Sequence, residues 1–171
     1  VIVGALGHRK ALRGYSGHLP SALKPGDRIQ ILNIGGVLGI CDSANPDVGA
    51  PFECEVLGTV LSFPYLGERI GVPARAGSNA LEEEPAIDTK GVPVVALAGT
   101  CMDSGKTAAA CAIVSRLRHL GFNVAACKAT GVSLRRDVLA MEDAGASTSM
   151  IFSDFGIVTT TLMQSSSLVS V

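Results

Sequence analysis

Apolar positions follow two different patterns along the chain, and the pattern changes between residues 75 and 92. Up to residue 75, short runs with β character alternate with turns that contain Gly and Pro, and no segment of helical period intervenes. These runs cover residues 28–34, 37–41, 53–61 and 69–72. We therefore predict a small antiparallel β domain at residues 1–75, with a barrel as the expected architecture.

The first of these runs shows the alternation on which the barrel prediction depends. Ile29, Ile31 and Asn33 fall on one face of a strand over residues 28–34. Arg28, Gln30 and Leu32 fall on the other face. Because apolar side chains occur on both faces, the pattern favours a closed or two-layered sheet over a flat one.

Residues 76–91 are polar and acidic and predict an interdomain linker. The chain then takes on an α/β pattern. Residues 92–98 are continuously apolar, which is typical of a strand buried on both faces of a parallel sheet. We expect a helix at residues 106–120, a strand at 122–127, a helix at 134–144 and the start of a third strand at 150–152.

The helix expected at residues 106–120 has both an apolar stripe and an end signal. Its last turn is basic, and Gly121 follows it as the C′ residue. The stripe expected to face the core consists of Ala109, Ile113, Leu117 and Leu120. In the same way, Gly145 is expected to end the second helix.

A glycine-containing loop lies between the apolar run and this helix and reads Gly-Thr-Cys-Met-Asp-Ser-Gly-Lys-Thr over residues 99–107. Such a turn directs backbone N–H groups and a helix N-terminus at one small volume, which attracts phosphate. Gly105 lets the backbone approach a phosphate, Lys106 reaches the β- and γ-phosphates, and the Thr107 hydroxyl is a ligand for Mg²⁺. The residues assigned to the nucleotide are Gly99, Thr100, Asp103, Ser104, Gly105, Lys106 and Thr107.

The loop departs from the usual spacing, because five residues separate Gly99 from Gly105 and Thr100 stands in place of the first glycine. Asp103 has two interpretations, contact with metal or substrate and a solvent-exposed loop acid.

The run Gly-Thr-x4-Gly-Lys-Thr resembles the phosphate loop of the dethiobiotin synthetase-like P-loop proteins, and the resemblance continues through residues 127–133 and 135–141. It implies that Lys128 lies near a substrate and that Asp137 holds Mg²⁺ beside Thr107. A strand-end charge at Lys128 and a first-turn helix acid at Asp137 are the structural alternatives. Residues 137–146 are also similar to the adaptor proteins of molybdopterin-guanine dinucleotide synthesis and to uncharacterised families with this loop, and the resemblance as a whole covers about residues 92–156.

Three functions fit this loop. The first is an ATP-dependent ligase, kinase or NTPase, in which Lys106 and Lys128 act on the transferring phosphoryl group and on a small anionic substrate. The second is a nucleotide-dependent switch or adaptor for a protein partner, and the third is a phosphate-binding module without turnover. No Asn-Lys-x-Asp segment is found in the given residues, which favours ATP over GTP as the nucleotide that accompanies Mg²⁺.

The amino-acid composition of the chain narrows the kinds of partner and the compartment that we expect. The net charge is −1 and the pI about 6.3, so we expect no nucleic acid partner. Five cysteines without a C-x-x-C pair fit neither a disulfide framework nor a zinc site, and together with the lack of a membrane span they favour the cytoplasm. A homo-oligomer is left open.

The sheet at residues 92–171 is expected to be incomplete, as in an excerpt of a longer protein, because about 80 residues are too few for five strands with their helices.

The N-terminal domain offers no assigned chemistry. A basic cluster of His8, Arg9, Lys10 and Arg13 is interpreted as a solvated turn. His8 and His18, with Tyr15 between them, are interpreted as ordinary surface or core residues, with ligand capture as an untested hypothesis.

Overall fold

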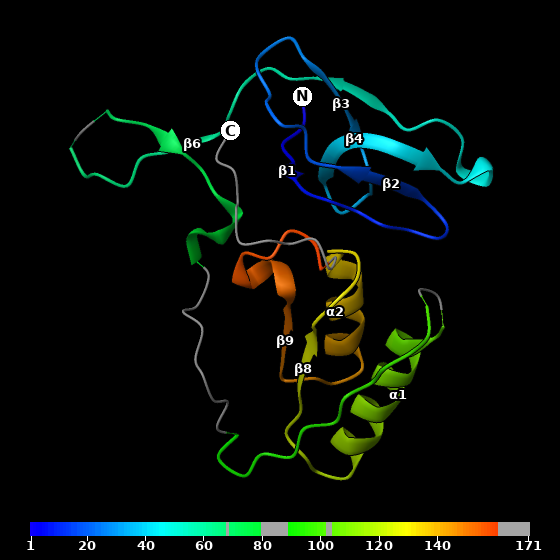
Figure 1. Cartoon of the computed structure of the whole chain (residues 1–171). Helices are drawn as coiled ribbons and strands as arrows, with labels where there is room; N and C mark the ends of the chain where they lie inside the picture. Colours follow the sequence, from blue (N-terminus) through cyan, green and yellow to red (C-terminus); the bar gives the residue numbers. More distant parts are fainter. Residues whose placement is uncertain (68, 80–88, 102–103, 161–171) are drawn as a thin grey trace. The chain divides into compact units, whose positions relative to one another are not determined.

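The computed structural model describes residues 1–67, 69–79, 89–101 and 104–160 (Figure 1). Its chain divides into two compact units. The first contains residues 1–79 together with the described residues 153–160, and the second ends at Phe152. The sequence analysis placed residues 153–160 in the second domain, whereas their contacts place them in the first unit. Part of the linker expected at residues 76–91, namely 80–88, lies outside the described residues.

The first unit is built around one curled, mainly antiparallel sheet with strand order β1-β4-β3-β5, in which β2 also pairs with β4 (Figure 1). The long strand β4 pairs with β1 in parallel and with β2 and β3 in antiparallel orientation. The strands are β1 (Ala5–Leu6), β2 (Tyr15–His18), β3 (Arg28–Ile31), β4 (Val37–Ala44) and β5 (Glu53–Glu55). Among the described strands the sheet remains open between β1 and β5, so it forms a half-barrel and not the closed barrel that was expected.

The alternation expected through residues 28–34 stops after Ile31, where β3 ends. Ile29 and Leu32 are both buried, although strict alternation placed them on opposite faces. The reason is the turn that follows. Asn33 Oδ1 accepts hydrogen bonds from the amides of Gly35 at 2.8 Å and Val37 at 3.2 Å, so Asn33 organises the turn into β4 and is not a strand residue.

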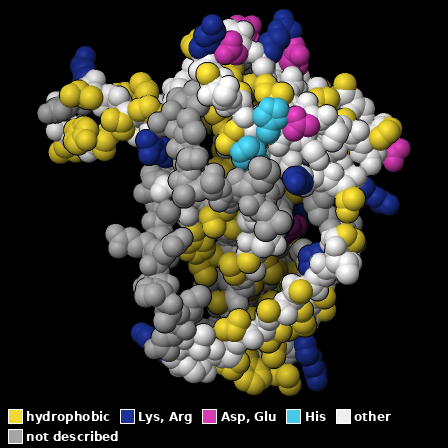
Figure 2. All heavy atoms as spheres, viewed as in Figure 1, with side chains coloured by type: hydrophobic (Ala, Val, Ile, Leu, Met, Phe, Trp, Pro, Cys, Tyr) yellow, Lys and Arg dark blue, Asp and Glu magenta, His cyan; other side chains and the backbone are white. Residues whose placement is uncertain are grey.

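Two smaller parts of the first unit follow β5. A two-stranded antiparallel hairpin consists of β6 (Leu61–Ser62) and β7 (Val72–Pro73), and its exposed apolar side chains are visible in Figure 2. A single-turn 3₁₀ helix at Ala76–Asn79 follows the hairpin; two others occur elsewhere in the described chain, at Pro46–Val48 before β5 and at Phe152–Phe155, where the second unit ends.

The second unit contains α1 (Lys106–His119), β8 (Ala125–Lys128), α2 (Arg135–Asp143) and β9 (Thr148–Ile151) (Figure 1). Strands β8 and β9 pair in parallel. The core consists of side chains from both helices and both strands, namely Val114, Ala126, Val138, Met141, Ile151 and Phe152. A mixed α/β fold and both predicted helices are confirmed, and Gly121 and Gly145 follow the helices with positive φ of 89° and 109°.

The complete parallel sheet of a P-loop protein is not found among the described residues. Residues 92–98 were expected to form a buried central strand, but they form no strand, and the side chain of Val94 is 75% exposed. The reason is that the parallel sheet of the described chain has only β8 and β9, and neither pairs with this run.

The buried stripe of α1 also differs from the expected one. Val114 is buried and Ala110 and Cys111 pack beside it, whereas Ala109 and Leu120 are exposed. The helix packs on α2, and the face bearing the expected stripe has no strand from residues 92–98 to cover it.

Candidate functional site

The loop at residues 99–107 enters α1 through a glycine in the left-handed region. Gly105 has φ 84° and ψ 8° and is the N-cap residue, and Lys106 is the first residue of the helix. A residue with a Cβ atom is strained in this conformation, so the sequence needs glycine here. Among the described residues no side chain caps this helix end, so its N–H groups remain directed toward the loop.

The loop closes tightly on itself. A Cβ atom at Gly99 would lie only 2.6 Å from Ser104 Oγ and 3.1 Å from Lys106 Cδ. Gly99 therefore lies against the side chains of Ser104 and Lys106, which would have to move to admit a larger residue.

Lys106 turns its ammonium group back over this loop. Its Nζ donates to the carbonyl oxygen of Cys101 at 2.5 Å and to Ser104 Oγ at 3.0 Å. The Thr100 hydroxyl lies 3.9 Å from Cys101 Sγ, and Thr107 occupies the first turn of α1. Met102 and Asp103 lie outside the described residues, so the assignment of Asp103 is not addressed.

The charged side chains of α1 are distributed unevenly between its two ends. The first turn carries no acidic residue, whereas Arg116, Arg118 and His119 lie in the last turn. Basic side chains at the C-terminus interact favourably with the helix dipole, and an uncapped N-terminus without acidic residues attracts anions. The arrangement is therefore able to bind an anion at the loop.

The two residues transferred by resemblance, Lys128 and Asp137, contact each other. Lys128 ends β8 and Asp137 lies in the first turn of α2. Lys128 Nζ donates to Asp137 Oδ2 in an ion pair whose side chains are 16% and 17% exposed. The Lys128 side chain runs past Gly131, where a Cβ atom would lie 3.7 Å from Lys128 Cε. The structure thus brings these two residues together, and no bond joins either of them to a described loop residue.

Among the described residues, no three His, Cys, Asp or Glu side chains are grouped so that they could hold one metal ion. No described helix has the length and apolar character needed to cross a bilayer.

A second polar cluster, in the first unit, was missed by the sequence analysis. His18 and Asp42 form a hydrogen-bonded pair, with Nδ1 and Oδ1 2.7 Å apart. The sequence analysis singled out His8 and His18 but not Asp42. Asp42 comes close to His18 only because β2 pairs with β4, which the sequence does not reveal.

Comparisons of this chain with protein-family models, with curated proteins and with solved structures found no match.

Proposed function

We propose that the loop at residues 99–107 binds the polyphosphate of a nucleoside triphosphate, ATP in preference to GTP, for phosphoryl transfer or ligation on a small anionic substrate. The observation that carries the proposal is the position of the Lys106 ammonium, folded over the loop toward Cys101 O and Ser104 Oγ. A polyphosphate oxygen can replace these two neutral acceptors with a charge-assisted bond.

The loop backbone supports the same ligand. The left-handed Gly105 opens α1 without a side-chain cap, and the absence of a Cβ atom at Gly99 allows the loop to close. Backbone amides at such a helix start are donors that phosphate oxygens accept from. Specificity for a nucleotide over another polyphosphate comes from the sequence resemblance alone.

The expected Mg²⁺ ion suits the donor atoms of Thr107 and Asp137, a hydroxyl and a carboxylate oxygen. Mg²⁺ takes oxygen ligands and in nucleotide sites is held by one or two protein groups together with phosphates and water. When bound, it would neutralise charge on the phosphates. Lys128 engages Oδ2 of Asp137, so the ion would take the other carboxylate oxygen or displace the ammonium from the pair.

The proposed role of Lys128 follows from the same pair. An ammonium released by Asp137 is available to neutralise a carboxylate or another anionic acceptor. Lys106 acts on the phosphates, so substitutions of the two lysines are expected to affect different measurements.

The first test is binding of ATP with Mg²⁺ to the full chain, measured by calorimetry. Lys106→Ala should weaken affinity roughly 10- to 100-fold, the loss expected for charge-assisted bonds. Lys24→Ala, at an exposed lysine of the first unit, is the matched control and should bind like the unaltered chain. Equal affinity in the Lys106→Ala variant would refute nucleotide binding at the loop.

The second test separates turnover from binding. Phosphate release is measured with a panel of carboxylic and amino acids, and stimulation by one compound supports transfer to that acceptor. Lys128→Gln should retain ATP affinity and lose the stimulated rate. A release rate that no small molecule changes would contradict the enzymatic part of the proposal but not nucleotide binding.

A further inference from the structure

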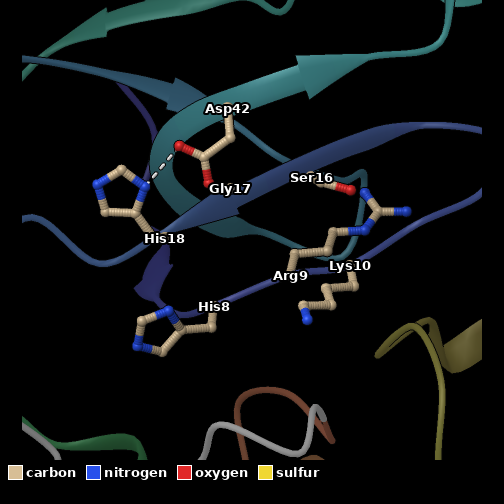
Figure 3. A pocket seen from close by; sticks show the side chains of 7 residues that line it. All are labelled: His8, Arg9, Lys10, Ser16, Gly17, His18 and Asp42. Carbon is tan, nitrogen blue, oxygen red and sulfur yellow. Dashed lines mark hydrogen bonds and ion pairs between the residues drawn. The ribbon is translucent and has the colours of Figure 1, made fainter.

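A small hollow of about 130 Å³ lies on the first unit and is lined by basic side chains and one carboxylate (Figure 3). An isolated antiparallel bridge joins Arg9 to Gly17 through two backbone hydrogen bonds of 2.9 Å. Continuing this register by one residue sets His8 opposite His18 and Lys10 opposite Ser16. The lining residues are His8, Arg9, Lys10, Ser16, Gly17, His18 and Asp42.

A β-bulge brings the carboxylate of this cluster into place. Ser16 pairs with Ser43 and Gly17 with Cys41, so Asp42 is an extra residue in β4. Bulges redirect side chains and are frequent beside functional sites. Asp42 accepts from His18 Nδ1 at 2.7 Å, which fixes the imidazole and leaves its Nε2 edge for another partner (Figure 3).

Gly17 makes this close arrangement possible. A Cβ atom there would lie 2.4 Å from the Ile40 carbonyl oxygen and 2.8 Å from a methyl group of Leu32. Any larger residue would separate β2 from its neighbours, so the hollow depends on glycine at this position.

Arg9 is a partly buried cation without a counter-ion in the described chain. Its guanidinium donates to the carbonyl oxygen of Leu32, a neutral acceptor, and no described carboxylate pairs with it. Burial lowers the pKa of Arg9, which means that its charged form lacks compensation. The guanidinium therefore adds a positive charge at the hollow that no described carboxylate offsets.

Lys10 adds a second cation at the hollow. Within the described residues neither Lys10 nor His8 has a side-chain hydrogen bond or ion pair. The one carboxylate that lines the hollow, Asp42, is already hydrogen-bonded to His18.

We propose that this hollow binds a small oxyanion, a phosphate or carboxylate group, through Lys10 and the two histidines that the bridge sets opposite each other. A metal cation is disfavoured, because two permanent cations line the hollow and only one carboxylate faces it. The Lys10 ammonium, a ring N–H of His8 and, in the imidazolium form, the Nε2–H of His18 are donors that suit the acceptor oxygens of such an anion.

The test follows the histidine ring signals of the full chain by NMR during titration with sodium phosphate, with sodium acetate and with sodium chloride at matched ionic strength. The Lys106→Ala background removes the proposed phosphate site in the second unit. The chain has three histidines, so His119, which lies on α1, is the internal control.

Phosphate should produce saturable shifts of His8 and His18 but not of His119. Lys10→Ala should weaken this binding roughly tenfold, as expected for one hydrogen bond to a charged group, and Lys24→Ala should not. Saturation by phosphate alone identifies a phosphate group as the ligand, and saturation by acetate as well identifies oxyanions in general. Shifts that only follow ionic strength, or that persist unchanged in Lys10→Ala, would overturn the proposal.

Discussion

At the scale of single residues, the pair of Lys128 and Asp137 admits both a structural and a functional role, and the two roles predict different energies. Both side chains are less than one-fifth exposed. Removing one partner leaves the other charge poorly solvated, which costs more than losing a surface ion pair. The pair therefore supports the fold of the second unit whether or not Asp137 also binds Mg²⁺.

A double-mutant cycle measures this support. Lys128→Met and Asp137→Leu should each destabilise the second unit by about 1–3 kcal/mol, because each leaves a partly buried charge without its partner. Lys128→Met combined with Asp137→Leu should recover part of the loss, since no charge is then buried. Urea unfolding followed by circular dichroism gives the free energies. Additive single effects would show that the ion pair contributes no coupling.

Repeating the cycle with ATP and Mg²⁺ links stability to the proposed function. If Asp137 leaves Lys128 to bind the ion, the coupling energy between the two residues should fall when both ligands are present. A coupling energy that ligands leave unchanged would assign Asp137 to the structure alone.

At the scale of elements, local signals were enough to predict the helices but not their packing. Gly105, Gly121 and Gly145 mark helix ends through their own backbone conformations, so the bounds of α1 and α2 follow from nearby residues. The buried face of α1 depends on which element covers it, and that information lies elsewhere in the chain. The expected stripe was therefore wrong at Ala109 and Leu120, which are exposed, whereas Ile113 and Leu117 are partly buried.

The exposed run at residues 92–98 gives a test at this scale. Val94→Lys should change the free energy of unfolding by less than about 0.5 kcal/mol, because the Val94 side chain is 75% exposed. Val138→Lys should cost more than about 3 kcal/mol, because Val138 is 1% exposed in the core of the second unit. Urea unfolding of both variants provides the comparison. A large cost for Val94→Lys would show that this run is buried in solution.

At the scale of the whole molecule, the chain contributes to the first unit twice. Residues 1–79 form its sheet, and residues 153–160 return to it after the second unit. Val158 packs in one cluster with Leu32 and Val37, and a Cβ atom at Gly7 would lie 3.0 Å from Val158 Cγ1. No local pattern could predict this return, because composition and periodicity describe neighbours in sequence and this contact joins residues about 150 positions apart.

Because residues 153–160 belong to the first unit, a substitution in this segment should destabilise the first unit and not the second. Val158→Asp should destabilise the first unit by about 2–4 kcal/mol, because it places a carboxylate among the apolar side chains of that core. Hydrogen exchange resolves the two units: protection should fall at β3 and β4 and stay unchanged at α2. Ile157→Asp, at a neighbouring side chain that is 39% exposed, is the matched control and should leave both units protected. A buried charge destabilises the core around it first. If exchange protection were lost only at α2, Val158 would therefore belong to the core of the second unit.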